Sequence, residues 1–341
     1  MEKLLEFSDI ALMPTIINNG VIEDKYDFGV VDQLDGTVSL PIFTAPSDSI
    51  VNAGNLRIWE SSGIKPILSR TLPLEQRLDL CQRNFVSFSL KEVNENFLAR
   101  GKRISQYQFH INIDNGNGHD TNLIQICNRL KQLYQNQVNI IAGNIGNSKV
   151  YLDYCKSGVD YVRVGMSTGS LVNPDKYGFY TPVASMLLDI LAMKSTVCVG
   201  LKHPKIIADG GIYTPSDILK ALALGADYVI CGRTFSKLVE ASGSIYRKVK
   251  TPEGKEALEP VSADIIKTAT IIKDLGLRRQ YSSTSFDSKF QDAKKGEWVE
   301  VSDTLEGWMR KLYDVFNYGF LMAGAKNWTE FKNNIKFGRI Q

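Results

Sequence analysis

The sequence predicts an α/β protein, a (β/α)8 TIM barrel with a long lid, or flap, inserted after the eighth strand. Short apolar runs alternate with longer amphipathic stretches, as repeated βα units require. Eight such runs occur, and polar residues gather where they end. The 341 residues are enough for one large barrel, and we expect a single domain over residues 1–341. A doubly wound parallel sheet is the alternative.

The eight strands are expected in the buried, β-branched runs at residues 41–45, 64–69, 84–90, 108–113, 138–143, 161–165, 205–209 and 228–232. Helical patterns at 121–135 and 215–224 lie between them. Residues 240–300 break the alternation, are rich in Lys, Glu, Ser and Gly, and include a helical stretch at 263–275. Such a long excursion is typical of a mobile flap. An amphipathic stretch at 304–324 predicts a helix that closes the barrel.

The composition, 43% apolar and 23% charged, is that of an ordinary globular protein. A net charge of +3 is too small to indicate nucleic acid or membrane as a partner. The first residues lack the apolar core of a signal peptide, and no apolar run has the length of a membrane span. The five cysteines show no disulfide or metal-binding spacing, which indicates reduced thiols, no metal site and a cytoplasmic protein.

Two consecutive strand ends carry glycines that suit a phosphate. Asp209-Gly210-Gly211 precedes a helix start, and Gly232-Arg233 follows the next strand. Glycines let backbone N–H groups approach an anion, and barrels often bind phosphate at these two loops. Asp209 could hold the two hydroxyls of a ribose. The alternatives are that the glycines only permit tight turns, that Asp209 caps its turn, and that Arg233 forms a surface salt bridge.

Several segments resemble the IMP dehydrogenase/GMP reductase family, in the family's order and over nearly the whole chain. They are LEFSDIALMP (5–14), TAPSDS (44–49), IDNGNGH (113–119), AGNI (142–145), GMSTGSLVNP (165–174), ADGGI (208–212), GADYV (225–229) and YSSTS (281–285). In length and organisation the chain resembles GMP reductase more than IMP dehydrogenase. The resemblance implies a purine nucleoside 5′-monophosphate as ligand, NAD(P)(H) and a monovalent cation as cofactors, and a homotetramer.

The resemblance also implies roles for individual residues. The phosphate and ribose would be held by Gly169, Ser170, Asp209, Gly210, Gly211, Gly232 and Tyr281. Arg233 stands where the family usually has a small residue, and its charge would add a direct contact to the phosphate. The purine edge would be read by Ser283 and Thr284. Asp114, Asn115 and Asn144 would face the nicotinamide, and Arg163 would lie beneath the reaction centre.

The reacting positions depart from the family pattern. Val172 stands where the family has its nucleophilic cysteine, and Pro174 stands where it has a threonine. In the flap, Lys295 stands in place of the acidic proton-transfer residue and Asp292 in place of an arginine. Valine cannot form a covalent intermediate, so the family's redox route is not expected here.

Three functions stay open on these residues. The protein could be an enzyme that works without a covalent adduct, with Lys295, Arg163, Asp175 or Asp292 as acid and base. It could be a non-catalytic nucleotide sensor, or a partner subunit of a true purine-nucleotide enzyme. A more distant reading is another phosphate-binding barrel, such as a flavin oxidoreductase or an aldolase.

Overall fold

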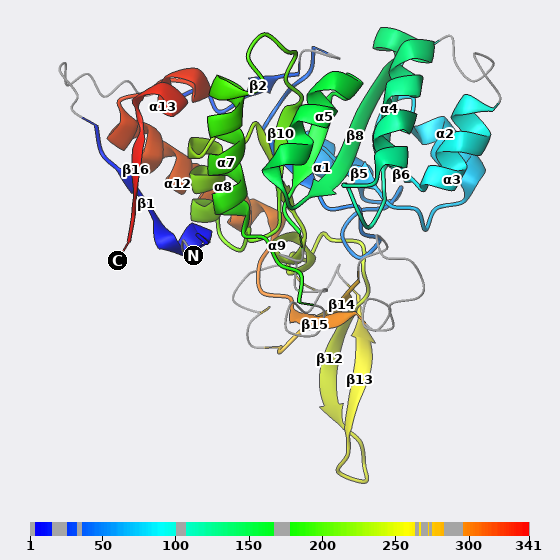
Figure 1. The fold of residues 1–341 in the computed structure, drawn as a ribbon. Helices are drawn as coiled ribbons and strands as arrows, with labels where there is room; N and C mark the ends of the chain where they lie inside the picture. The colour runs from blue at the N-terminus through cyan, green and yellow to red at the C-terminus, as the bar shows by residue number, and fades with distance from the viewer. Residues whose placement is uncertain are drawn as a thin grey trace.

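The computed structural model describes residues 4–15, 26–32, 36–99, 107–166, 178–262, 266, 272, 275–282 and 296–340. Eight parallel strands form its central sheet, in the order β4-β11-β10-β9-β8-β7-β6-β5 (Figure 1). Their bounds are β4 Ile42–Thr44, β5 Ile67–Leu68, β6 Phe85–Phe88, β7 Phe109–Ile113, β8 Val138–Ile145, β9 Tyr161–Val164, β10 Lys205–Asp209 and β11 Tyr228–Cys231. All eight predicted strands are confirmed.

The sheet closes on itself between its first and last members. The Thr44 N–H donates to the Lys65 carbonyl at 2.9 Å, and the Lys65 N–H donates to the Ile42 carbonyl at 3.0 Å. Because β4 pairs both with β11 and with the segment before β5, the sheet has no free edge. The structure is therefore a TIM barrel, and the alternative of an open doubly wound sheet is wrong.

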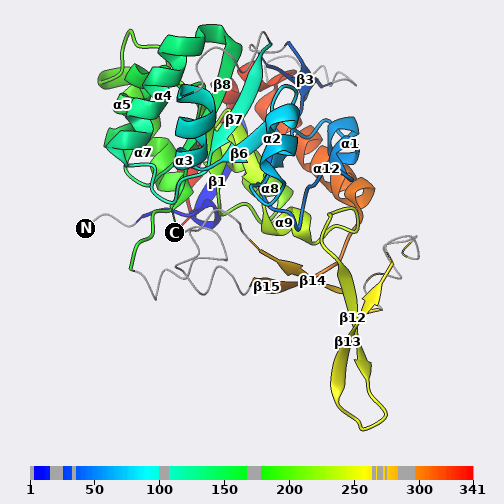
Figure 2. The same cartoon turned by 90° about the vertical axis from the view of Figure 1, so that its right-hand side faces the viewer.

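Helices surround the barrel, as Figures 1 and 2 show. They are α1 Leu56–Ser61, α2 Leu74–Leu80, α3 Leu90–Val93, α4 Thr121–Tyr134, α5 Tyr151–Ser157, α7 Val183–Thr196, α8 Pro215–Ala223, α9 Arg233–Ser236, α12 Leu305–Ala323 and α13 Trp328–Asn334. Shorter helical turns are η1 Phe7–Asp9, η2 Asn94–Leu98, η4 Gln135–Gln137 and η5 Ser148–Val150. In the described ranges, no helix is long and apolar enough to cross a membrane.

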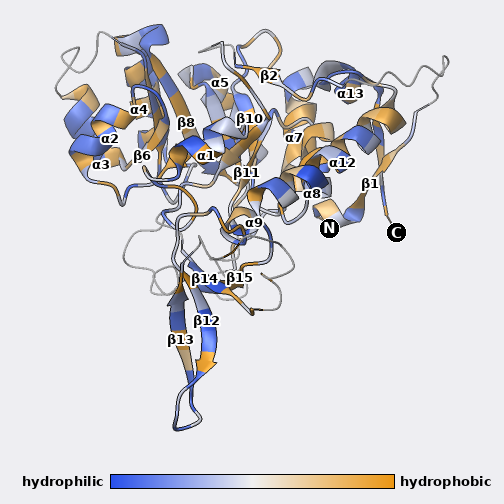
Figure 3. Cartoon of the chain, turned by 180° about the vertical axis from the view of Figure 1, so that it is seen from behind, coloured by the Kyte–Doolittle hydropathy of each residue, from blue (hydrophilic) through white to orange (hydrophobic). Residues whose placement is uncertain are grey.

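Helix α12 confirms the helix predicted at 304–324, but strand pairing closes the barrel, not this helix. α12 packs outside, against α8. The two helices approach closely at Gly319, where a Cβ atom would lie 2.5 Å from the Leu219 side chain. Apolar residues on α7, α8 and α12 appear as orange segments in Figure 3. These helices bury apolar side chains against the outside of the barrel. This burial is the main source of the helices' stability.

Two short pairs of strands lie outside the barrel. β1 (Ile10–Met13) pairs antiparallel with β16 (Lys336–Arg339), which joins the two ends of the described chain. β2 (Val30–Val31) pairs antiparallel with β3 (Val38–Ser39).

The flap after β11 is built on a four-stranded antiparallel sheet, in the order β13-β12-β14-β15. Its strands are β12 Ile245–Lys250, β13 Glu256–Val261, β14 Arg278–Tyr281 and β15 Glu297–Glu300. The β12–β13 hairpin projects away from the barrel (Figures 1 and 2). The sequence predicted the excursion but not this sheet. Most of the helical stretch expected at 263–275 lies outside the described residues.

Candidate functional site

Three polar side chains from neighbouring strands meet at the carboxyl end of the barrel. Asp209, the last residue of β10, accepts hydrogen bonds through Oδ2 from Arg163 Nε at 2.8 Å and Arg163 Nη2 at 2.7 Å. Asn144 Nδ2 donates to the same oxygen at 2.6 Å. Burial alone would lower the pKa of the Arg163 guanidinium, but the carboxylates of Asp209 and Asp114 outweigh it and raise the pKa. The centre of the mouth is therefore a charged, hydrogen-bonded group.

A row of polar side chains continues from Asp209 and Arg163 into the barrel. Arg163 Nη1 lies 3.5 Å from Asn112 Oδ1, and Asn112 Nδ2 donates to Ser87 Oγ at 2.9 Å. Residues two apart on a strand face the same side, so Tyr161 and Phe85 lie one layer deeper inside the barrel. That deeper layer is apolar, and its aromatic rings contact one another edge to face. The barrel is thus filled at its base and polar at its mouth.

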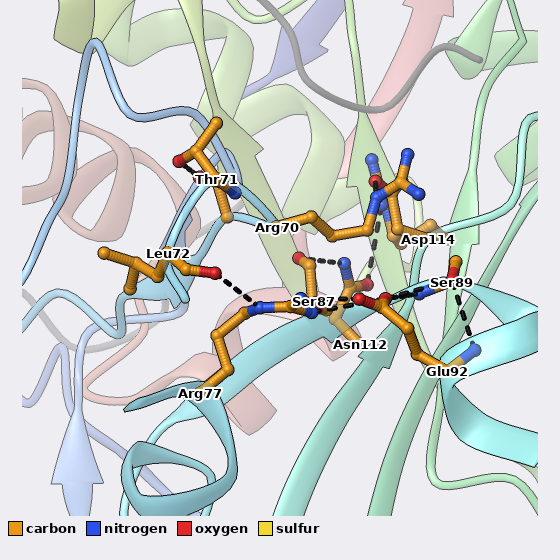
Figure 4. A network of polar contacts seen from close by, with 11 residues as sticks. Arg70, Thr71, Leu72, Arg77, Ser87, Ser89, Glu92, Asn112 and Asp114 are labelled. Carbon is orange, nitrogen blue, oxygen red and sulfur yellow. Dashed lines mark hydrogen bonds and ion pairs between the residues drawn. The ribbon is translucent and has the colours of Figure 1, made fainter. Parts of the chain in front are cut away.

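A second charged group is formed by residues that follow β5 and β7 (Figure 4). Arg70 Nε donates to the buried Asp114 carboxylate at 2.9 Å. Below it, Arg77 Nη2 pairs with Glu92 at 2.5 Å. Burial alone would raise the pKa of Glu92, but hydrogen bonds from Arg77 and Ser89 bring it down to about 2. Sequence reasoning singled out Asp114 and missed its partner Arg70, since nothing local marks a pair 44 residues apart.

The Asn115 side chain does not contact the group formed by Asp209, Arg163 and Asn144. Its Nδ2 donates to the Asn117 carbonyl at 3.2 Å, within its own loop. The same loop is tied to the next one by His119, whose Nε2 accepts from the Gly146 N–H at 3.0 Å. An accepting Nε2 carries no proton, so Nδ1 must carry it and donate to Asn117 Oδ1. Burial lowers the pKa of His119, which favours this neutral form.

The glycine turns predicted to form a phosphate site lie side by side. Gly210 and Gly211 have φ of 109° and 70°, in the left-handed region that favours glycine. Thr234 Oγ1, after the next strand, donates to the Ile212 carbonyl at 2.8 Å and so joins the two loops. At Gly232 a Cβ atom would lie 2.5 Å from the Tyr281 hydroxyl. The flap strand β14 thus covers the second turn directly.

The start of α8 is occupied by a carboxylate of the chain itself. The Asp217 side chain accepts from the N–H groups of Tyr213 and Thr214, and Thr214 Oγ1 caps the helix in return. This is a capping box. Asp217 therefore already places a negative charge at the N-terminus of α8, where the helix dipole favours an anion. A bound phosphate would depend mainly on the N–H groups of the glycine turns.

Arg233 forms the salt bridge that the sequence left open as its alternative role. Its Nη2 donates to Glu297 Oε1 at 2.6 Å, and Glu297 belongs to the flap strand β15. Burial raises the pKa of the nearby Tyr281 hydroxyl, and the charges of Asp209 and Glu297 raise it further, so the phenol is neutral. The Tyr281 hydroxyl is therefore near enough to both carboxylates to be affected by their charges.

Buried contacts that the sequence did not predict fix the flap to the barrel. Arg279 has no exposed surface, and its guanidinium donates to the backbone carbonyls of Ser236, Leu238, Val239, Ala241 and Gly243. Ser47, after β4, donates to the Ser282 carbonyl at 2.5 Å. The neighbouring Ser49 Oγ accepts from the Ser282 N–H at 3.4 Å. The position of Tyr281 is thus set by contacts on both sides of it along β14.

Several predicted residues lie outside the described residues. They are Gly169, Ser170, Val172, Pro174 and Asp175 in the loop after β9, and Ser283, Thr284, Asp292 and Lys295 in the flap. Their roles stay predictions.

All five cysteines are described, free and buried. Burial raises the pKa of the thiols of Cys81, Cys127, Cys155 and Cys231, to about 12 for the first three. A thiol attacks as its thiolate, so these four are not suited to act as nucleophiles at neutral pH. Among the residues with a described position, no group of His, Cys, Asp and Glu could hold a metal ion.

The fold and the site define a TIM-barrel protein with a polar, glycine-rich site at the carboxyl end of its strands. A model of the IMP dehydrogenase / GMP reductase domain matches residues 78–341. The chain belongs to the IMP dehydrogenase/GMP reductase family.

Two relatives and one solved structure illustrate the range of similarity. The inosine-5′-monophosphate dehydrogenase of Rhodopirellula baltica is 31% identical over 230 residues, which cover 67% of this chain and 40% of that protein. The GMP reductase of an Exiguobacterium species is 26% identical over 268 residues, 76% of this chain and 77% of that protein. A crystal structure of inosine 5′-monophosphate dehydrogenase from Legionella pneumophila matches with a TM-score of 0.71 and 20% identity, covering 99% of both chains. That structural match supports the fold.

Proposed function

We propose that this protein binds a purine nucleoside 5′-monophosphate at the mouth of its barrel and does not carry out cysteine-dependent redox chemistry. The observation that carries the proposal is the grouping of Asp209 with the two glycine turns. Asp209 offers carboxylate oxygens for a ribose, and Gly211 and Gly232 lie at neighbouring strand ends where backbone N–H groups can approach a phosphate. Membership of the family supports the same ligand class.

The residues assigned to a nicotinamide are engaged with other groups of the chain. Asp114 pairs with Arg70, and the Asn144 amide donates to Asp209 and to the Gly165 carbonyl. These contacts link the loops at the mouth of the barrel, so a structural role is proposed for Asp114 and Asn144. NAD(P)(H), a monovalent cation and a homotetramer stay predictions from the family.

The chemical part of the proposal rests on Val172 and Pro174. Loss of a covalent nucleophile alone lowers kcat by factors on the order of a million in enzymes where it has been measured. The buried cysteines elsewhere offer no replacement. A binding protein without turnover is therefore favoured over an oxidoreductase. An enzyme using Arg163 or Lys295 as acid or base is the alternative.

Calorimetry with IMP, GMP, XMP and AMP, and with the matching nucleosides, tests the proposal. We expect at least one monophosphate to bind with a Kd on the order of micromolar and its nucleoside to bind more weakly. Asp48→Asn, an exposed carboxylate in the loop after β4, is the matched control and should leave binding unchanged. Failure of every monophosphate to bind would refute the proposal.

A parallel assay separates the binding protein from the enzyme. IMP with NAD+ or NADP+, and GMP with NADH or NADPH, are followed at the absorbance of the reduced nicotinamide. We expect no turnover. Turnover that exceeds a heat-inactivated sample would favour the alternative enzyme.

A further inference from the structure

Arg233 and Glu297 join the barrel to the flap beside the glycine turns. Arg233 directly follows Gly232 and begins α9, and Glu297 begins β15. In the flap sheet Glu297 lies opposite Tyr281, whose hydroxyl contacts Gly232. The ion pair therefore lies at the point where the flap covers the second glycine turn.

The ion pair between Arg233 and Glu297 does not use all the hydrogen-bonding groups of the two side chains. A single contact of 2.6 Å joins Arg233 Nη2 to Glu297 Oε1, and both side chains are 33% exposed. Arg233 Nε and Glu297 Oε2 are both buried without a hydrogen-bond partner in the described structure. An arginine can offer two parallel N–H groups to a carboxylate or phosphate, and here it offers one. One donor and one acceptor are thus left buried and unused beside the site.

A phosphate monoester suits Arg233 better than Glu297 does. It carries nearly two negative charges and three acceptor oxygens, so it can take Nε and Nη2 together. A phosphate at the Gly232 turn and the Glu297 carboxylate would also repel each other. Both effects favour exchange of the carboxylate for the phosphate.

We propose that Glu297 is an internal competitor that holds Arg233 until the 5′-phosphate of a nucleotide displaces it, which frees β15 from the barrel. The inference rests on the proposed function, and it adds a regulatory role for the flap. Glu297 lowers the affinity for the phosphate, and binding of the phosphate is coupled to release of β15. Gly296, with φ of 61°, directly precedes Glu297 in a left-handed conformation that favours glycine.

Two substitutions should change affinity in opposite directions. Glu297→Gln keeps the shape of the side chain but removes the competing charge, so monophosphate affinity should rise by about 3- to 10-fold. Arg233→Gln removes the guanidinium, so affinity should fall by about 10-fold or more. In the Arg233→Gln background, Glu297→Gln should raise affinity by less, because only the direct repulsion between the carboxylate and the phosphate is then removed. The nucleoside, which lacks the phosphate, should be insensitive to all three changes.

The matched control is Glu256→Gln. Glu256 lies in the same flap sheet and pairs with Lys248 at 2.7 Å, but on the exposed hairpin. This variant should bind the monophosphate like the unmodified protein. Thermal melting of each variant confirms that it is folded before binding is measured.

Hydrogen exchange reports the release of β15. Addition of monophosphate should speed exchange of the amides in the β14–β15 ladder, between Arg278–Tyr281 and Glu297–Glu300, and Arg233→Gln should abolish that response. Monophosphate binding with Glu297→Gln and Arg233→Gln both unchanged, or both weakened, would overturn the inference alone. No binding to the unmodified protein would overturn the proposed function and the inference with it.

Discussion

The contact between Gly232 and Tyr281 can be tested by a double-mutant cycle. A Cβ atom added at Gly232 would lie 2.5 Å from the Tyr281 hydroxyl oxygen, closer than real Cβ contacts allow. The next atoms, Ala45 Cβ at 3.4 Å and Tyr281 Cζ at 3.5 Å, are at ordinary contact distance. The clash of Gly232→Ala is therefore with the hydroxyl alone, and Tyr281→Phe should remove it.

The magnitude follows from this geometry. Tyr281 is 8% exposed and its strand is paired on both sides, so the ring cannot move away freely. Overpacking of this kind costs about 1–3 kcal/mol. Any other cost of Gly232→Ala is the same in both backgrounds and cancels in the cycle. We expect a coupling free energy of about 1–2 kcal/mol between the two substitutions.

Urea denaturation of the four proteins measures this coupling. Gly116→Ala serves as a matched control, because nothing lies within 4 Å of a Cβ atom at Gly116. It should leave the free energy of unfolding within about 0.5 kcal/mol of the unmodified protein. Additive effects of Gly232→Ala and Tyr281→Phe, within about 0.5 kcal/mol, would show that β14 does not lie against this turn.

Four further outcomes follow from single sites. Arg279→Met should lower the free energy of unfolding by about 3 kcal/mol or more, because buried carbonyls lose their donor, whereas the exposed neighbour Arg278→Met should have little effect. Asp209→Asn should cost about 3–5 kcal/mol, because a buried guanidinium loses its counter-charge; a cost under about 1 kcal/mol would contradict this. His119 has a pKa below its ordinary 6.5 in the folded state, so its contribution to stability is complete above that pH and is lost as pH falls below it. In urea titrations at several pH values, His119→Gln should flatten this dependence. Val172→Cys alone should not restore NADH production from IMP, since Pro174 and the flap substitutions persist; clear NADH production would refute the flap assignment.

The barrel could be predicted from the sequence because each of its strands is a buried apolar run. Such runs have a local signature that does not depend on partners. The start of α8 was also predicted, from a glycine turn followed by a helical pattern at 215–224. The fold class and the family both followed from patterns of this local kind.

The flap sheet could not be read in the same way. β12 and β13 carry charges on exposed positions, and cross-strand pairs such as Arg247–Glu259 satisfy them. Without a buried face the alternation of apolar residues is absent. The turn between them, with Pro252 and Gly254, was the one signal that could have indicated a hairpin.

The site was predicted in its residues but not in its pairings. Asp209 and Asn144 were expected at the mouth because strand ends meet at one face of a barrel, and the family resemblance implied that Arg163 lies beneath the reaction centre. The partners Arg70, Arg279 and Glu297 were missed. Each acts on a residue far away in the chain, and single-sequence patterns carry no information on such contacts.

The polar layer at the mouth is itself an argument that a ligand site has been kept. Two residues deeper on the same strands, Tyr161 and Ile207 fill the barrel with apolar side chains. At the mouth the equivalent positions are the buried Arg163 and the partly buried Asp209, which pair with each other. Replacing a buried ion pair with apolar side chains of similar size is often neutral or stabilising, so stability alone does not account for charges in this layer. A carboxylate held in place by a buried guanidinium does suit the hydroxyl groups of a bound ribose. The positions proposed to bind a nucleotide thus carry paired polar side chains, which agrees with the proposal of a protein that binds a nucleotide at this mouth.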